Sequence, residues 1–355
     1  MTELVVLFGS DLDLDDYRRR HERGAAPDRL PYGTEHAPGG WTIVPLGGRA
    51  GAHLRRRFSE WAKRRLGLDL PHAWHHRRAL RAARYIYCHS EIDYLAVAAV
   101  LRVTRARRPC LVGQTLWLFN EWPTLPRWRR AVVRWCLARV DLFIANARPN
   151  AELGRTLVPG ARHEFVPFGV SATFADGASL PAASGDLVLA VGNDRARDWE
   201  TLLTACSRLP ARMRLRIASS RRIPGAPTSA VAPTASIGEL KELYRSAAAL
   251  AVVVTENAHA SGITTLLEAA AAGCPAVASR AGGLDDYFSD EEVLFVPVGD
   301  STALTAALLR LAEDPDERGR RSALLRAAFR DRAYTNAEYW QRVVERIAEH
   351  AVADR

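Results

Sequence analysis

The chain has 355 residues, of which 48% are hydrophobic, and it carries a formal net charge of +9. The length favours two domains, the apolar fraction excludes a disordered chain, and the longest apolar runs are far shorter than the roughly 18–20 residues that a membrane-spanning helix needs. Five scattered cysteines without a C-x-x-C pair indicate neither a disulfide framework nor a zinc site.

The first 174 residues alternate between strand and helix patterns. The N-terminal run at 4–8 predicts a buried strand and lacks the basic start and cleavage site of a signal peptide, so we expect a cytoplasmic protein. Further apolar runs predict strands at 84–88, 109–113, 141–145 and 164–167, and a helix at 92–103. Strands that are apolar throughout belong to a parallel sheet covered on both faces.

A small, polar segment at 175–186 predicts a linker between domains. The alternation then restarts, with strands at 187–191, 215–218, 250–254, 275–278 and 293–296, and helices after Asp198 and Ser236, at 264–272 and at 302–312. A last helix begins with the capping box at Thr335. We predict an α/β fold of two doubly wound, Rossmann-like domains (1–174 and 187–334) that face a cleft, with a final helix at 335–355.

The most informative segment spans 256–283. A strand ends near Val254, and a turn at Ser261 and Gly262 opens a helix. The first-turn amides of Ile263, Thr264 and Thr265 are predicted to be unpaired at the positive end of the helix dipole, which suits a diphosphate. Glu268, one turn further, is placed to accept hydrogen bonds from sugar hydroxyls. The alternative is an ordinary capped helix with Glu268 in solvent.

This segment resembles the donor-binding segment of retaining glycosyltransferases with the GT-B fold, of the GT4 type. The residues in register are Glu268-Ala269, Ala271, Gly273, Pro275 and Gly282-Gly283, with further matches at 294–300 and 166–170. The resemblance implies transfer of a sugar, with retained configuration, from a nucleotide-diphosphate sugar to an acceptor hydroxyl. It implies that residues 1–174 bind the acceptor, that 187–334 bind the donor with Glu268 on the ribose, and that 335–355 cross back to the first domain.

The sequence departs from this family in two donor segments. The family pairs Glu268 with a second acid eight positions earlier, where this chain has Ala260, so His259 or the more distant Glu256 is the expected replacement. In the other segment, Gly192 is followed by Asn193 where the family has an arginine, so Arg197 or Arg195 is expected on the diphosphate and in catalysis. The alternative for this second segment is a solvated turn with surface arginines.

In the first domain, Gly9 and Ser10 lie where the family's glycine-rich loop approaches the donor phosphates. Gln114 or Thr115 stands where the family often has a histidine near the sugar, and Gln114 is taken as the catalytic candidate. His89 is the acceptor-binding candidate, with a structural, cleft-lining histidine as the alternative.

Two basic tracts, 53–84 and 125–139, contain interleaved tryptophans and predict a peripheral contact with the inner face of a membrane. The alternative is a core helix with a solvated arginine face. No nucleic-acid-binding motif is present, so nucleic acid is not an expected partner.

We therefore expect a metal-independent glycosyltransferase with no cofactor besides its nucleotide-sugar cosubstrate, because no D-x-D motif lies in a donor position. The arginine- and alanine-rich composition suggests a bacterial source. The acceptor is either a natural product or a lipid-linked or cell-surface saccharide, made in secondary metabolism or polysaccharide synthesis, and the donor base stays open among UDP, GDP and dTDP. The alternatives are a sugar-nucleotide epimerase on the same fold and a non-catalytic nucleotide-sugar-binding protein.

Overall fold

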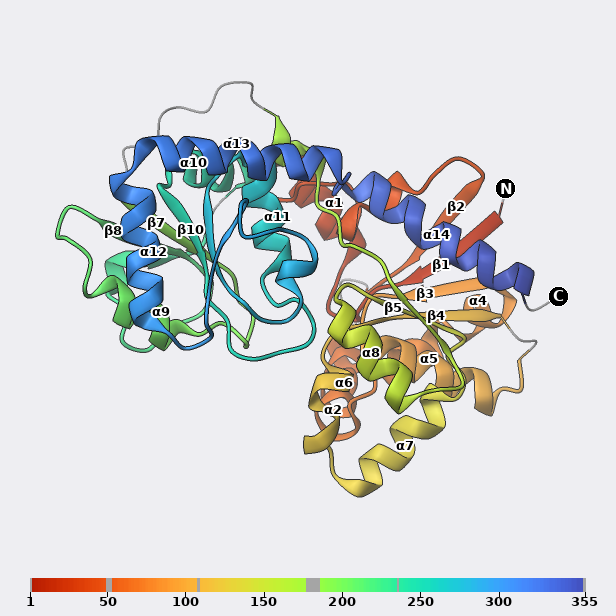
Figure 1. Ribbon diagram of the computed structural model, residues 1–355. Coiled ribbons are helices and arrows are strands. Elements are labelled where there is room, and N and C mark those ends of the chain that lie inside the picture. The colour runs from red at the N-terminus through yellow and green to blue at the C-terminus, as the bar shows by residue number, and fades with distance from the viewer. Residues whose placement is uncertain (1, 49–52, 107–108, 177–185, 235, 354–355) are drawn as a thin grey trace. The chain divides into compact units, whose positions relative to one another are not determined.

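The computed structural model describes residues 2–48, 53–106, 109–176, 186–234 and 236–353 (Figure 1). The chain divides into two compact units. Unit 1 comprises residues 1–20, 29–167 and 339–355, and unit 2 comprises 21–28 and 168–338. The chain thus enters unit 2 after Pro167, whereas the sequence placed that boundary at 174. The expected linker at 175–186 lies mostly outside the described residues.

Unit 1 is built on a six-stranded, wholly parallel sheet in the order β2-β1-β3-β4-β5-β6. Its strands are β1 (Thr2–Leu7), β2 (Trp41–Leu46), β3 (Tyr85–Cys88), β4 (Cys110–Thr115), β5 (Leu142–Ala145) and β6 (Arg162–Phe165). Five of them were predicted from their apolar runs. The edge strand β2 was missed because it is half-buried along its length and contains Pro45, which interrupts a strand pattern.

Helices flank this sheet, and α5 is buried along most of its length beneath its neighbours (Figure 1). Its near-continuous apolar sequence explains this position, since a helix that is apolar all round belongs inside a core. The helical elements are α1 (Leu14–Glu22), η1 (Pro31–His36), α2 (His53–Leu66), α3 (Leu70–His75), α4 (Arg77–Ala82), α5 (Glu91–Val103), α6 (Leu118–Glu121), η2 (Trp122–Thr124), α7 (Arg127–Leu137), α8 (Arg148–Leu157) and α14 (Asn336–Ala353).

Unit 2 repeats the plan with a second parallel sheet in the order β12-β11-β10-β7-β8-β9. Its strands are β7 (Leu187–Val191), β8 (Arg214–Ala218), β9 (Val231–Ala232), β10 (Ala249–Val252), β11 (Ala276–Ser279) and β12 (Leu294–Val296). Its helical elements are η3 (Ala172–Ala175), α9 (Trp199–Cys206), η4 (Thr228–Ala230), α10 (Ile237–Ser246), α11 (Ile263–Ala272), η5 (Leu284–Asp286), α12 (Ser301–Glu313) and α13 (Pro315–Asp331).

Two of the predicted helix starts are confirmed by their caps. The Asp198 carboxylate accepts a hydrogen bond from the Thr201 amide, and the Ser236 hydroxyl accepts one from Glu239. Each cap satisfies an amide that the helix itself leaves unpaired.

The strand order marks one crevice in each unit. In unit 1 the chain moves from β1 to β2 on one side and then to β3 on the other, and in unit 2 it moves from β7 to β8 and then to β10. Parallel sheets bind ligands beyond the carboxyl ends of the strands where the order reverses. The loops after β1 and β3, and those after β7 and β10, are therefore the places for functional side chains.

Candidate functional site

In unit 2, the strand order reverses at the carboxyl ends of β7 and β10, and this switch point is closely packed around one arginine. Gly192 follows β7 with φ 139°, and Gly262 precedes α11 with φ 89°, a region that favours glycine. A Cβ at Gly192 would lie 2.7 Å from Arg197 Nε, and one at Gly262 would lie 3.0 Å from an Arg197 terminal nitrogen and 2.4 Å from Val252. Both glycines therefore make room for the Arg197 side chain.

Arg197 is held at the N-terminus of α11. It is 7% exposed and donates from Nη2 to the Thr265 hydroxyl at 2.9 Å. Its Nε is buried and makes no hydrogen bond within the described residues. Burial lowers the pKa of Arg197, whereas Asp194, Tyr244 and Glu268 raise it. A guanidinium stays charged in proteins, so this is a fixed cation with donors to spare.

The other residues of the β7 loop have different partners. Asn193 accepts hydrogen bonds from the Ser219 hydroxyl at 2.8 Å and from the Ser220 amide at 2.9 Å, which tie this loop to the one after β8. Arg195 has an exposed side chain. Of the two arginines expected on the diphosphate, the structure brings Arg197 to the helix N-terminus.

Asp194, which the sequence analysis did not single out, joins the loops after β7 and β10. Its carboxylate accepts from the Ala196 amide at 2.9 Å and from the Ser261 hydroxyl at 2.8 Å. His259 is buried nearby, and burial, together with Arg195, lowers its pKa to about 4 against the opposing effect of Asp194. His259 is therefore neutral at physiological pH.

The first turn of α11 corrects one expectation. The Ile263 amide was expected to be unpaired, but it donates to the Ala260 carbonyl at 3.0 Å because the turn before the helix closes tightly. The amides of Thr264 and Thr265 remain, and no backbone partner for them is found in the described part of the chain. Thr264 is exposed and Thr265 is buried against Arg197.

Ala260 itself has a left-handed backbone, with φ 52°. Its amide donates to the Gly282 carbonyl at 2.8 Å, and its side chain is buried. The position at which the resembled family has its first acid is thus occupied by a small residue in a strained conformation.

Glu268 does not lie in solvent, so the alternative of an ordinary solvated helix face is wrong. The Tyr244 hydroxyl donates to Glu268 Oε2 at 2.8 Å, and Tyr244 is fully buried on α10. Burial raises the pKa of Glu268 to about 7, although the Tyr244 hydrogen bond and the Arg197 charge both lower it. Tyr244 lies on the helix predicted after Ser236, and the sequence analysis did not single it out.

In unit 1, His89 follows β3 at the switch point. It is 6% exposed, and its Nδ1 lies 2.9 Å from Gln114 Oε1. Burial lowers the pKa of His89 to about 3, so the ring is neutral. Because an amide oxygen only accepts, Nδ1 carries the hydrogen and Nε2 presents a lone pair. Nε2 is buried and has no hydrogen-bond partner within the described residues.

Gln114, expected among the catalytic residues, is 3% exposed and lies behind His89. Its oxygen accepts from the Tyr87 hydroxyl at 3.1 Å, and its nitrogen donates to Asn146. Both ends of its amide are therefore used. This placement makes Gln114 a positioning residue for His89 instead of a group that touches substrate.

Gly9 and Ser10 follow β1 on the other side of the same switch point. A Cβ at Gly9 would lie 2.6 Å from an Asp11 carboxylate oxygen, so the loop turns tightly there. The Ser10 hydroxyl is buried without a hydrogen-bond partner among the described residues. Phe8, which precedes them, stacks on His89 with ring centroids 5.4 Å apart.

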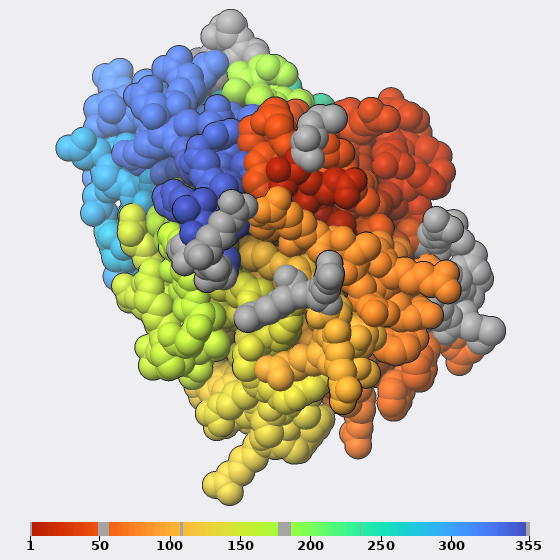
Figure 2. Space-filling view, turned by 90° about the vertical axis from the view of Figure 1, so that its right-hand side faces the viewer, coloured from red at the N-terminus to blue at the C-terminus, as the bar shows by residue number. Residues whose placement is uncertain are grey.

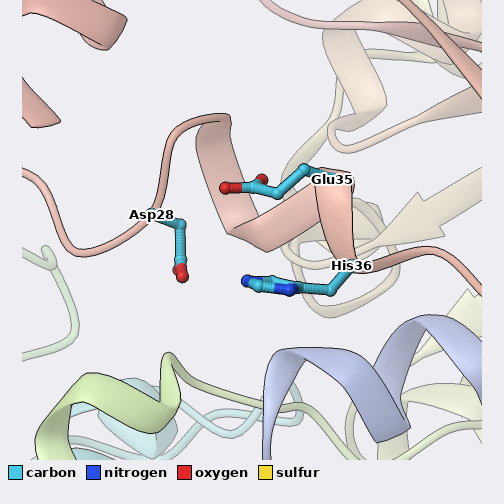
Figure 3. A group of neighbouring side chains, drawn as sticks. All are labelled: Asp28, Glu35 and His36. Carbon is cyan, nitrogen blue, oxygen red and sulfur yellow. The ribbon is translucent and has the colours of Figure 1, made fainter.

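Figure 3 shows three side chains of metal-ligating types, Asp28 on the segment before η1 and Glu35 and His36 on η1 itself. Asp28 accepts from the Ser171 hydroxyl at 2.9 Å and from Asn336 at 2.7 Å within unit 2. Glu35 accepts from the Leu30 amide within unit 1. Both carboxylates therefore already accept hydrogen bonds from protein groups. The expected metal independence stays a prediction.

None of the described helices combines the length and the apolar character needed to cross a bilayer.

Residues 185–314, most of unit 2, match the family model described as glycosyl transferases group 1. No curated protein sequence matches the chain. Among solved structures, a sucrose-phosphate synthase from Thermosynechococcus elongatus is 17% identical, with a TM-score of 0.73 over 99% of this chain and 100% of that one.

HepE of Anabaena, in complex with UDP and glucose, is 12% identical with a TM-score of 0.70 over 98% of this chain and all of that one. A glycosyltransferase from Rickettsia africae is 11% identical with a TM-score of 0.65 over 99% and 98%. The resemblance drawn from residues 256–283 is thereby confirmed at the level of glycosyl transferases group 1, and so is a fold of two doubly wound, Rossmann-like domains of the GT-B type.

Proposed function

We propose that the chain is a retaining, metal-independent glycosyltransferase that moves a sugar from a nucleotide-diphosphate sugar to an acceptor hydroxyl. The observation that carries the proposal is the buried Arg197 guanidinium at the N-terminus of α11, one turn from Glu268. The match of residues 185–314 to glycosyl transferases group 1 and the complex of HepE with UDP and glucose support this reading.

Arg197 has the properties required to bind a diphosphate. The hydrogen bond to Thr265 fixes the position of its guanidinium, its Nε donor has no protein partner in the described chain, and the helix dipole adds to its field. A preorganised cation stabilises the charge that grows on a departing diphosphate without any reorganisation in the transition state. Arg197 is therefore assigned to leaving-group stabilisation.

Glu268 is assigned to the nucleotide ribose. Tyr244 occupies Oε2 and fixes the carboxylate, so Oε1 is the oxygen that accepts a ribose hydroxyl. Arg197 keeps the pKa of Glu268 lower than burial alone would set it. The same arginine thus serves both the diphosphate and the ionised state of the ribose-binding acid.

Unit 1 is assigned to the acceptor, with the His89 Nε2 lone pair accepting a hydroxyl hydrogen bond. A group with a pKa of about 3 is a poor general base. We therefore assign the acceptor proton to the departing phosphate on the same face of the sugar, which retains configuration. A natural product and a lipid-linked or cell-surface saccharide are the two proposed acceptor classes, used in the cytoplasm.

The test is a calorimetric titration of UDP, GDP, dTDP and their sugars, followed by turnover of each nucleotide sugar that binds, with and without EDTA. Release of nucleotide diphosphate with transfer or hydrolysis of the sugar supports the proposal. Conversion of the donor into an epimer would instead support an epimerase. Tight binding with no turnover, for every donor and a broad acceptor panel, would support a binding protein and overturn the enzyme.

A further inference from the structure

Unit 1 carries an apolar groove of about 840 Å³ on its outer helix layer. Helices α2, α3, α5 and α7 form it, and its lining includes Trp61, Trp74 and Trp135. These three indoles are 55%, 47% and 44% exposed. Phe58, also exposed, stacks on Trp61 with ring centroids 5.5 Å apart.

Helix α7 contributes both to the core and to this face, and buried core residues such as Leu68 and Cys136 form part of the groove's lining. The core side of α7 consists of Val133, Cys136 and Leu137, all buried. Trp128, Val132 and Trp135 are exposed, so α7 also presents an apolar surface to the outside. Helix α7 therefore has the core side and the exposed arginines of the alternative, and in addition an exposed apolar surface that the alternative did not include.

An exposed surface of this kind is unusual for a protein that stays in water. Single exposed apolar residues are common, but contiguous apolar patches mark places of contact. The groove also lies along the later part of α5, from Ala99 to Val103, whereas His89 precedes the start of that helix. It is thus distinct from the switch-point residues described above.

The charge around the groove indicates what covers it. Residues 53–84 hold ten lysines and arginines against two acidic residues, and residues 125–139 hold five arginines and no acidic residue. These two segments together carry +13, more than the +9 of the whole chain, so the remainder is net negative. The positive charge of the chain is therefore concentrated on the two segments that supply most of the groove's lining.

Arginines and indoles are also paired in space. The Arg77 guanidinium lies 5.1 Å from the Trp74 ring centroid, and that of Arg102 lies 5.2 Å from the Trp135 ring. Arg64 and Arg65, next to the groove residue Leu66, are exposed. In Figure 2 the yellow surface of α7 adjoins the orange surface of the preceding segments.

We infer that this face docks unit 1 on an anionic lipid bilayer. Tryptophan is suited to the boundary between headgroups and acyl chains, because its ring is apolar and its N–H is polar. Arginine can keep its stem in the apolar layer and its head among lipid phosphates. An acidic protein partner would also match the positive charge. It would not account for three exposed tryptophans around one groove, which a bilayer interface does.

The inference is tested by co-sedimentation of the full chain with vesicles, independently of any catalytic activity. Vesicles of phosphatidylcholine with one third phosphatidylglycerol should bind the chain, and pure phosphatidylcholine should not. Binding should weaken as salt rises, because the headgroup attraction is screened. R64Q/R65Q should lower the partition coefficient about 25-fold, from roughly fivefold for each basic residue near an anionic surface.

The matched control is R222Q/R330Q, which removes two charges from exposed positions of unit 2 and should leave binding unchanged. W61Q/W74Q should also lose vesicle binding, with nucleotide binding by unit 2 and the thermal transition showing that the variant is folded. Equal binding to neutral vesicles, no binding to anionic ones, or equal losses in the control would overturn the inference. So would a wild-type dimer that W61Q/W74Q converts to a monomer without any change in vesicle binding.

Discussion

Replacing Arg197 with alanine tests the donor site most directly. The change removes a buried cation that Thr265 holds 2.9 Å away and that lies over Gly192 and Gly262. If Arg197 stabilises the departing diphosphate, kcat should fall by about 10²–10³, or roughly 2.7–4 kcal/mol, the scale for one preorganised donor. Binding of the intact sugar nucleotide should fall much less, because the charge on the leaving group is larger in the transition state.

The structure adds a second effect to this variant. Arg197 lowers the pKa of Glu268, which burial raises to about 7. Without the guanidinium, Glu268 should bind its proton more tightly, so the pH above which nucleotide binds well should move upward. Calorimetry at several pH values between 6 and 9, together with steady-state kinetics, separates this effect on binding from the effect on kcat.

Two variants serve as controls for Arg197→Ala. Arg197→Lys should recover only part of the rate, because an ammonium cannot bridge two oxygens in one plane. Arg195→Ala, at an exposed position in the same loop, should be close to wild type. If Arg195→Ala lowers kcat strongly and Arg197→Ala does not, Arg195 is the residue that binds the diphosphate. Normal kcat in both variants would refute the assignment of this loop to the diphosphate.

The remaining predictions concern Glu268, His89 and metal. Glu268→Ala should weaken nucleotide binding by about 1.5–3 kcal/mol in calorimetry, the range for hydrogen bonds to a charged group, and unchanged affinity would contradict the ribose role. The pKa of Glu268 is raised from 4.5 to about 7 in the folded protein. The free energy of unfolding should therefore fall as pH rises from 4.5 to 7, by about 3 kcal/mol at most, because the folded state binds the proton more tightly. Denaturant titrations of Glu268→Gln should lack this pH dependence. Gln114→Ala should raise KM for the acceptor, because His89 loses the hydrogen bond that orients it. Adding His89→Ala to this variant should raise KM little further, and an effect confined to donor binding would contradict the assignment. Activity should persist in excess EDTA, and a strict requirement for magnesium or manganese would show that the arginine does not replace a metal.

The sequence predicted those parts of the fold that depend on local patterns. The buried strand β7 was predicted with its observed bounds, because an unbroken apolar run between polar segments leaves little choice. The edge elements β2 and β9 were missed, since half-buried or two-residue strands carry no such pattern. The start of α11 after Gly262 was predicted from Ser261 and Gly262, whose geometry is likewise local.

Other features of the site depend on contacts between distant segments. Arg197 is one of many arginines, and only the fold shows that it is buried against Thr265, 68 residues away. Tyr244 lies on the helix predicted after Ser236, but its hydroxyl contact with Glu268 spans 24 residues and depends on the fold. Similarly, the tryptophans of the basic tract at 125–139 were recognised in the sequence, but only the fold shows that the core contacts Val133, Cys136 and Leu137 while Trp128 and Trp135 are exposed.

The alternative of a solvated turn for residues 192–198 fails on energetic grounds. The loops after β7 and β10 contain two glycines with positive φ, a left-handed Ala260, and a buried guanidinium whose Nε makes no hydrogen bond in the described chain. The left-handed Ala260 and the unsatisfied guanidinium donor are each unfavourable for stability alone, since a strained backbone at a non-glycine residue costs about 1–3 kcal/mol and a buried unsatisfied donor costs a similar amount. A surface turn in an arginine-rich chain would expose its arginine, as it does with Arg195, and would need none of them. Their concentration at one switch point supports the diphosphate site proposed above, because a bound anion would satisfy the guanidinium and the first-turn amides of α11 together.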